Sequence, residues 1–68
     1  MNIAESLKQA RKRKGLTQDE LAYRSGVSQS AISDIESGKR TNPTADTLGC
    51  LAAALDVSIL ALYDPKEN

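Results

Sequence analysis

The apolar residues of this 68-residue chain recur at intervals of three and four, which is the spacing of one face of an α-helix. Near the start Ile3, Leu7 and Ala10 follow that spacing, and Gly15 supplies a left-handed helix stop. No segment alternates between apolar and polar residues over a useful length. The pattern predicts an all-α protein whose first helix runs from about Asn2 to Lys14.

Two short helices are predicted next, one directly after the other. Thr17 and Glu20 are spaced as a capping box that starts the first of them, and Gly26 ends it. Ser28 is the N-cap of the second, which runs from about Gln29 to Ser37 and is ended by Gly38. The inward positions of this pair are Leu21, Ala22, Val27, Ile32 and Ile35.

A turn that contains a glycine with positive φ prevents two such short helices from lying antiparallel, so they must cross steeply. The sequence therefore predicts a helix-turn-helix over about residues 18–37. Thr44 then caps a fourth helix and Ser58 a short fifth one, which the Asp64-Pro65 pair ends. Their predicted core positions are Leu48, Leu51, Ala52 and Leu55 in the fourth, and Ile59, Leu62 and Tyr63 in the fifth. We expect residues 1–68 to form a single five-helix domain.

Composition limits what this domain can do. The chain has one cysteine, Cys50, and no histidine, so it lacks an internal disulfide, the commonest metal ligand and the usual acid or base of an active site. We therefore expect no enzymatic activity, no cofactor and no metal. No apolar run approaches the roughly 18 residues of a membrane span, and the first fifteen residues do not have the apolar stretch of a signal peptide. A cytoplasmic protein without membrane contact is the expectation.

The net charge of zero conceals a segregated pattern. Residues 1–43 carry eight Lys or Arg against five Asp or Glu, a net +3, whereas residues 44–68 carry one against four, a net −3. Such asymmetry suggests one surface that faces an anion. A charge run is more often a solvated face, so composition alone does not establish binding to nucleic acid.

A family resemblance lies in the stretch GLTQDELAYRSGVSQSAISDIESGKRTNP and in the LGCLAAALDVS that follows it. These residues resemble the lambda-repressor-like (Xre/Cro-CI) family of helix-turn-helix DNA-binding domains, and TNPT, ALDVS and LYD resemble the SinR type within it. The resemblance covers nearly the whole chain. It implies a five-helix bundle whose third helix is the recognition helix. We expect a transcriptional regulator, a repressor that binds a palindromic operator in double-stranded DNA as a homodimer.

The third helix carries the candidate base-reading residues on the side opposite Ile32 and Ile35, namely Gln29, Ser30, Ser33 and Asp34. Gln29 lies where family members insert toward the major groove, and a glutamine amide can pair bidentately with adenine. The alternative is that Gln29 contacts only phosphate or water. Asp34 can accept a hydrogen bond from cytosine but is repelled by phosphate, so it is expected to exclude sequences.

Phosphate contacts are expected from the ends of the helices around the third one. Gln18 is the leading candidate, because its backbone N–H and its amide lie at a positively polarised helix N-terminus. The other candidates are Thr17, Ser28, Ser37, Lys39, Arg40, Thr41 and Asn42. The family resemblance also implies a structural ion pair between Arg11 and Glu36.

A homodimer is expected to form through the C-terminal half of the chain. Leu60 is predicted on the solvent side of the fifth helix, and Gly49, Cys50 and Ala53 on the outer side of the fourth. These residues would form one apolar patch. The alternative is that Leu60 extends the core and that Cys50 is half-buried.

A protein-interaction module, such as an antitoxin or an antirepressor, is the alternative function, since it can use the same fold to hold a protein partner. Two features favour DNA over that alternative: the Thr17-Gln18 helix start, and the basic Lys39-Arg40 pair after the third helix. A module that binds only protein has no need to keep phosphate contacts.

Overall fold

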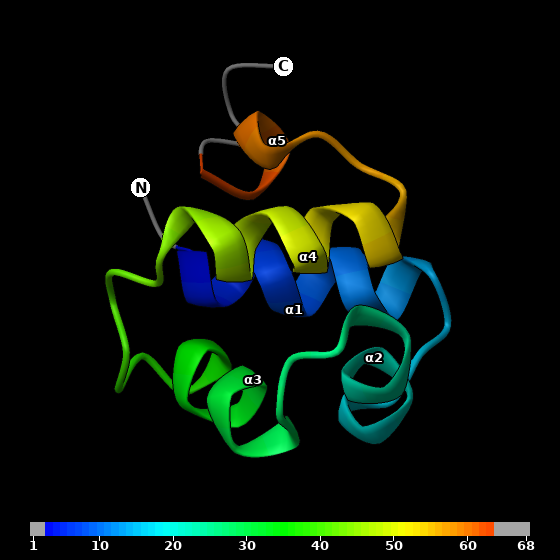
Figure 1. The fold of residues 1–68 in the computed structure, drawn as a ribbon, viewed down its shortest axis with the longest axis horizontal. Helices are drawn as coiled ribbons and strands as arrows, with labels where there is room; N and C mark the ends of the chain where they lie inside the picture. Colours follow the sequence, from blue (N-terminus) through cyan, green and yellow to red (C-terminus); the bar gives the residue numbers. More distant parts are fainter. Residues whose placement is uncertain (1–2, 64–68) are drawn as a thin grey trace.

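Five helices and no strand make up residues 3–63, which are the residues that the computed structural model describes (Figure 1). The helices are α1 (Ile3–Arg13), α2 (Gln18–Ser25), α3 (Gln29–Glu36), α4 (Ala45–Leu55) and α5 (Ile59–Tyr63). The predicted all-α class and the five predicted helices are thus confirmed. Two helix ends differ from the prediction by one residue. Helix α1 ends at Arg13 and not at Lys14, and α3 ends at Glu36, with Ser37 as its C-cap.

The helix starts are fixed locally by side-chain caps, as the sequence predicts. At the start of α2 the Thr17 hydroxyl accepts a hydrogen bond from the Glu20 backbone N–H at 3.1 Å, and the Glu20 carboxylate accepts one from the Thr17 N–H at 2.8 Å. The Ser28 and Thr44 hydroxyls cap α3 and α4, each accepting a hydrogen bond from one backbone N–H. These bonds satisfy N–H groups that have no partner inside the helix.

The turn between α2 and α3 depends on Gly26, whose φ is 77°. Glycine adopts this left-handed conformation without the steric cost that a Cβ brings. At the end of α4 the same conformation falls on Asp56, with a φ of 59°, the one residue other than glycine with positive φ among those described. A short polar side chain such as aspartate tolerates this region better than most.

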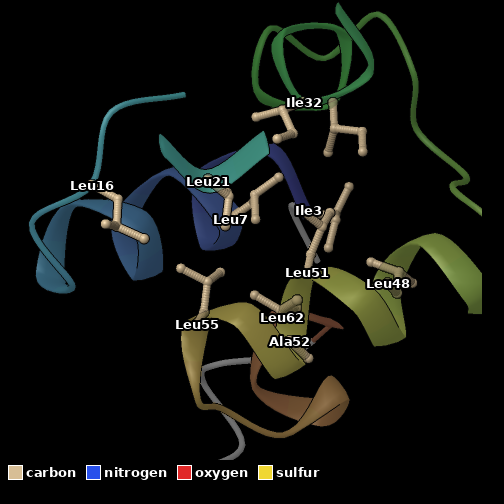
Figure 2. Close-up of a cluster of buried hydrophobic side chains, with 11 residues drawn as sticks. Ile3, Leu7, Leu16, Leu21, Ile32, Leu48, Leu51, Ala52, Leu55 and Leu62 are labelled. Carbon is tan, nitrogen blue, oxygen red and sulfur yellow. The ribbon is translucent and has the colours of Figure 1, made fainter. Parts of the chain in front are cut away.

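The core lies where all five helices meet. Helix α1 packs against α3 and α5, α2 against α3 and α4, and α4 against α5. Figure 2 shows Leu7 of α1, Leu21 of α2, Ile32 of α3 and Leu55 of α4 converging on the same interior. Its buried apolar members are Ile3, Leu7, Leu16, Leu21, Ile32, Ile35, Leu48, Leu51, Ala52, Leu55 and Leu62. The predicted core faces of the first four helices are confirmed, with Ala10, Ala22 and Val27 half-buried at the edge.

The predicted core face of α5 is wrong at Ile59. Leu62 is buried, but Ile59 is 38% exposed. Ile59 is the first residue of a five-residue helix, and its Cδ1 lies over the backbone of Gly49 in α4, 3.9 Å from where a Cβ would stand. Gly49 is consequently half-buried rather than outward. The side chain of Tyr63 and the Asp64-Pro65 stop lie outside the described residues.

Helix α5 and the α2–α3 pair occupy opposite edges of the molecule, with α1 and α4 between them (Figure 1). The longest helices have 11 residues, so within the described part of the chain none is long and apolar enough to cross a membrane. The same residues contain no group of three or more His, Cys, Asp or Glu that could hold a metal ion.

Candidate nucleic-acid interface

The outward face of α3 is polar along its length. Ile32 and Ile35 anchor the helix in the core, where both are fully buried. That anchoring turns the other side of α3 outward, so Gln29 and Ser30 are exposed and Ser33 and Asp34 are half-exposed. The four predicted base-reading residues therefore share one accessible face.

Gln29 and Gln18 are joined by a hydrogen bond across the helix-turn-helix. The Gln29 Nε2 donates to the Gln18 Oε1 at 3.0 Å. Both residues occupy the first position of their helices, α3 and α2. The crossing of the two helices brings these N-termini together, so the predicted base-reading residue and the predicted phosphate contact form one unit.

Gln18 is held in turn by Glu36 at the far end of α3. Its Nε2 donates to the Glu36 Oε1 at 3.1 Å. Glu36 also accepts two bonds from Arg11 of α1, from Nε to Oε2 at 2.7 Å and from Nη2 to Oε1 at 2.9 Å. The remaining guanidinium nitrogen, Nη1, donates to the carbonyl oxygen of Leu16 at 2.7 Å.

The Arg11–Glu36 ion pair is largely removed from solvent, with side-chain exposures of 12% and 3%. Burial alone would raise the pKa of the Glu36 carboxyl, but hydrogen bonds from Arg11 and Gln18 and the nearby charges of Arg11 and Lys8 hold that pKa below its usual value. The hydrogen bond to Glu36 raises the pKa of Arg11 against the opposing effect of burial. Both groups are therefore ionised at neutral pH.

The predicted phosphate contacts after α3 form a second group, at the C-terminal end of that helix. Ser37 uses its hydroxyl internally, donating to the Asp34 carbonyl at 3.1 Å and accepting from the Lys39 N–H at 3.4 Å. Arg40 is anchored by its backbone N–H to the same Asp34 carbonyl, and its guanidinium lies 4.0 Å from the Asp34 carboxylate. The exposed members of this group are Ser37, Lys39, Arg40, Thr41 and Asn42.

Thr17 and Ser28 lie at the starts of α2 and α3, and both are exposed. Each hydroxyl oxygen accepts a capping bond from a backbone N–H. Because a hydroxyl donates as well as accepts, each can still give its hydrogen to a phosphate while it caps its helix.

The proposed dimer residues are only partly on one surface. Leu60 is 72% exposed, and Cys50 and Ala53 are exposed on the outer side of α4. Gly49 lies beneath Ile59 instead. The apolar or weakly polar residues that are exposed on the outer side of α4 and on α5 are therefore Cys50, Ala53, Ile59 and Leu60, and we refer to these four residues as the α4–α5 patch.

Sequence reasoning missed the hydrogen bonds that Gln18 makes to Gln29 and Glu36, and also the Asp34–Arg40 pair. Gln18 lies 11 residues from Gln29 and 18 from Glu36 along the chain. No periodicity within a single helix signals such contacts, because they depend on how the helices cross. The one available signal was glutamine at the first position of both helices, which the capping residues locate.

Comparison with known proteins agrees with the predicted helix-turn-helix. A helix-turn-helix family profile matches residues 7–62. The transcriptional regulator SinR of Bacillus subtilis is 44% identical over 66 residues, which is 97% of this chain and 60% of that protein. The chain thus spans less than two thirds of that relative. This relative is a regulator of transcription, which is the class of protein that the sequence analysis predicted, rather than an enzyme.

Two solved structures have the same fold. The N-terminal DNA-binding domain of SinR from Bacillus subtilis matches with a TM-score of 0.91 at 42% identity, over 97% of this chain and 96% of that one. A crystal structure of SinR in complex with DNA matches with a TM-score of 0.89 at 44% identity, over 91% of this chain and 98% of that one.

Proposed function

The chain belongs to the helix-turn-helix family, and from this premise we propose that it is a sequence-specific regulator of transcription, a repressor that binds double-stranded DNA. The observation that carries the proposal is the polar outward face of α3, with Gln29 at its N-terminus bonded to Gln18 of α2. The DNA-bound structure of a relative with this fold supports it. A DNA-binding role in turn favours the cytoplasm as the place where the protein acts.

In this proposal α3 enters the major groove and the ends of the neighbouring helices bind the backbone. Gln29 reads a base edge, and Ser30, Ser33 and Asp34 line the same groove. Gln18 offers its backbone N–H at the start of α2, where the helix dipole favours a phosphate. Lys39 and Arg40 add positive charge after the other end of α3.

The first test is the salt dependence of binding to a duplex. A dimer that neutralises on the order of 6 to 10 phosphates loses about 10³- to 10⁵-fold in affinity between 50 and 200 mM salt. Fluorescence anisotropy with a labelled duplex selected from a randomised library measures that slope. Affinity that does not change over this range would refute binding to the DNA backbone, and the protein-interaction module would then be the better account.

The second test separates base reading from phosphate binding. Gln29→Ala should cost about 1 to 3 kcal/mol on the selected duplex and leave non-specific binding nearly unchanged, whereas Lys39→Ala should weaken both about equally. If Gln29→Ala lowers both alike, Gln29 is a backbone contact.

We further propose that two copies associate through the α4–α5 patch. The patch leaves α2 and α3 uncovered, because α5 lies at the opposite edge from them (Figure 1). Its large members are Leu60, which is 72% exposed, and Ile59. A two-fold dimer with recognition helices roughly 34 Å apart would read an approximately palindromic operator.

Sedimentation of a charged variant tests this interface. Leu60→Lys should give a folded monomer that keeps half-site contacts and loses most of its operator affinity. Tyr23→Lys is a matched control, since Tyr23 is 92% exposed on α2 and lies outside the patch. A Leu60→Lys variant that still sediments as a dimer, or a parent that is monomeric at high concentration, would contradict the interface.

A further inference from the structure

The loop after α3 folds back over the end of that helix and returns an arginine to its polar face. Gly38, with a φ of 87°, makes the reversal, because glycine adopts this left-handed conformation without steric cost. The Asp34 carbonyl oxygen then accepts hydrogen bonds from the Ser37 hydroxyl at 3.1 Å and from the Arg40 backbone N–H at 3.0 Å. These two bonds fix the start of the Arg40 side chain beside Asp34.

The side chains of Asp34 and Arg40 meet where the outward face of α3 ends. The Arg40 Nη2 lies 4.0 Å from the Asp34 Oδ2, and both side chains are partly exposed. We propose that this ion pair couples base reading to phosphate binding. On an operator that offers cytosine, Asp34 takes the cytosine amino group and Arg40 moves to a phosphate, whereas on other sequences Arg40 stays with Asp34. The inference rests on the proposed DNA-binding function.

The carboxylate of Asp34 needs a hydrogen-bond donor when it lies in the major groove. A carboxylate only accepts hydrogen bonds, and a charge that is removed from water without a partner is costly. The major-groove edge of cytosine offers the N4 amino donor, whereas thymine offers the O4 acceptor and a methyl group, and guanine offers two acceptors. Cytosine is therefore the base that can replace Arg40 as the partner of Asp34, and thymine is a direct mismatch.

The pair is weak enough to be exchanged. An exposed ion pair contributes little to stability, because water and salt screen both charges. The bonds that hold the loop use backbone groups and the Ser37 hydroxyl. The Arg40 guanidinium can therefore leave Asp34 while the loop keeps its shape. Lys39, the neighbouring exposed cation, is not part of this pair and is available to phosphate on any sequence.

The exchange makes the number of phosphate contacts depend on the sequence. With cytosine at the position that Asp34 reads, each bound copy places both Lys39 and Arg40 on the backbone. With thymine there, Arg40 remains with Asp34 and each copy neutralises about one phosphate fewer. The logarithm of affinity falls with the logarithm of salt concentration by about 0.9 for each phosphate neutralised on duplex DNA. The difference is therefore measurable as a salt slope.

The experiment compares two duplexes that differ only at the base pair that Asp34 reads. Selection from a randomised library gives the operator, and that base pair is the one whose preference disappears in Asp34→Ala. The parent should favour cytosine over thymine there by about tenfold, as expected for one good base contact. Fluorescence anisotropy at several salt concentrations then gives the salt slope on each duplex. The parent slope should be steeper on the cytosine duplex by about 0.9 for each bound copy.

Arg40→Ala removes the exchanging cation. It should reduce the salt slope on the cytosine duplex by about 0.9 for each copy and leave the slope on the thymine duplex nearly unchanged, so that the two slopes become equal. Lys39→Ala is the matched control, because it removes an exposed positive charge from the adjacent position. It should reduce both slopes equally and keep the difference between them.

Asp34→Ala releases Arg40 on every sequence. On the thymine duplex its salt slope should become as steep as that of the parent on the cytosine duplex, and it should bind that duplex more tightly than the parent does. If Asp34 reads a base without holding Arg40, Asp34→Ala changes the base preference and leaves both slopes unaltered, which contradicts the exchange. Circular dichroism shows that each variant is folded. Arg40→Gln, which keeps much of the side-chain stem, replaces Arg40→Ala if the latter is not.

Several results would overturn the inference and leave the proposed function intact. The parent could select a base other than cytosine at the position that Asp34 reads, or Asp34→Ala could lose no preference. Arg40→Ala could also reduce the slope equally on both duplexes, as an independent phosphate contact does, or on neither. A parent that selects no sequence and binds no duplex is a different outcome, because the proposed function itself then fails.

Discussion

Helix α3 carries two acidic residues, each facing an arginine, and the two pairs differ in almost every physical respect. Glu36 meets Arg11 at 2.7 Å with side-chain exposures of 3% and 12%. Asp34, two positions earlier, lies 4.0 Å from Arg40 with exposures of 37% and 49%. One helix thus presents a carboxylate to the interior and another to the solvent.

The comparison shows that surroundings decide what an ion pair does. A buried pair is hard to break, since the loss of one partner leaves the other as an uncompensated charge away from water. An exposed pair contributes little, because water and salt screen it. The inner pair, Arg11–Glu36, therefore belongs to the architecture that holds α1 against α3. The outer pair, Arg40–Asp34, leaves Arg40 accessible for the phosphate contact that we propose.

Arg11→Ala, which removes one partner of the buried pair, should have the largest effect on stability. It should lower the free energy of unfolding by roughly 3 to 5 kcal/mol, because Glu36 would keep its charge without its main partner. Chemical denaturation monitored by circular dichroism measures the change. Arg13→Ala on the same helix, where the side chain is exposed, is the control and should have almost no effect. An unchanged midpoint for Arg11→Ala would show that the pair is not structural.

Acid should weaken the inner pair through Glu36. Its pKa is lower in the folded protein than usual, so the stabilisation is fully present above the unfolded value of about pH 4.3 and is lost as pH falls through the folded pKa. The difference in unfolding free energy between the parent and Glu36→Gln should therefore shrink between neutral pH and pH 3. Denaturation at several pH values measures it, and a constant difference would contradict this account.

The outer pair should give the smallest effect. Arg40→Ala should change the free energy of unfolding by no more than about 1 kcal/mol, and the change should diminish further in high salt. The same denaturation series, repeated at low and high salt, tests both statements. A loss as large as that of Arg11→Ala would mean that Arg40 holds the C-terminal end of α3 in place.

The parts of the fold that local chemistry determines were predictable from the sequence. Thr17, Ser28 and Thr44 mark helix starts, and each cap involves residues only three positions apart. The buried faces of the first four helices follow from their period. The inner ion pair came from the family resemblance instead, because no local pattern joins Arg11 to Glu36, 25 residues away.

The features that the sequence did not predict depend on how the helices pack against one another. Ile59 satisfied the spacing of a core residue, yet it begins α5 with its side chain against Gly49 of α4, and it remains partly exposed. The position of the Gln18 amide between Gln29 and Glu36 requires the crossing of α2 and α3. These are tertiary contacts, and neither the spacing of apolar residues within a helix nor a capping residue predicts them.

The burial of Glu36 also has a genetic consequence. A screen for mutants that fail to repress is ordinarily interpreted as a map of the surface that touches the operator. Under the proposed repressor function such a screen should also recover substitutions at Glu36, although its side chain is 3% exposed. Alleles at this position should act by lowering the amount of folded protein, whereas alleles at the exposed positions of α3 should leave that amount normal.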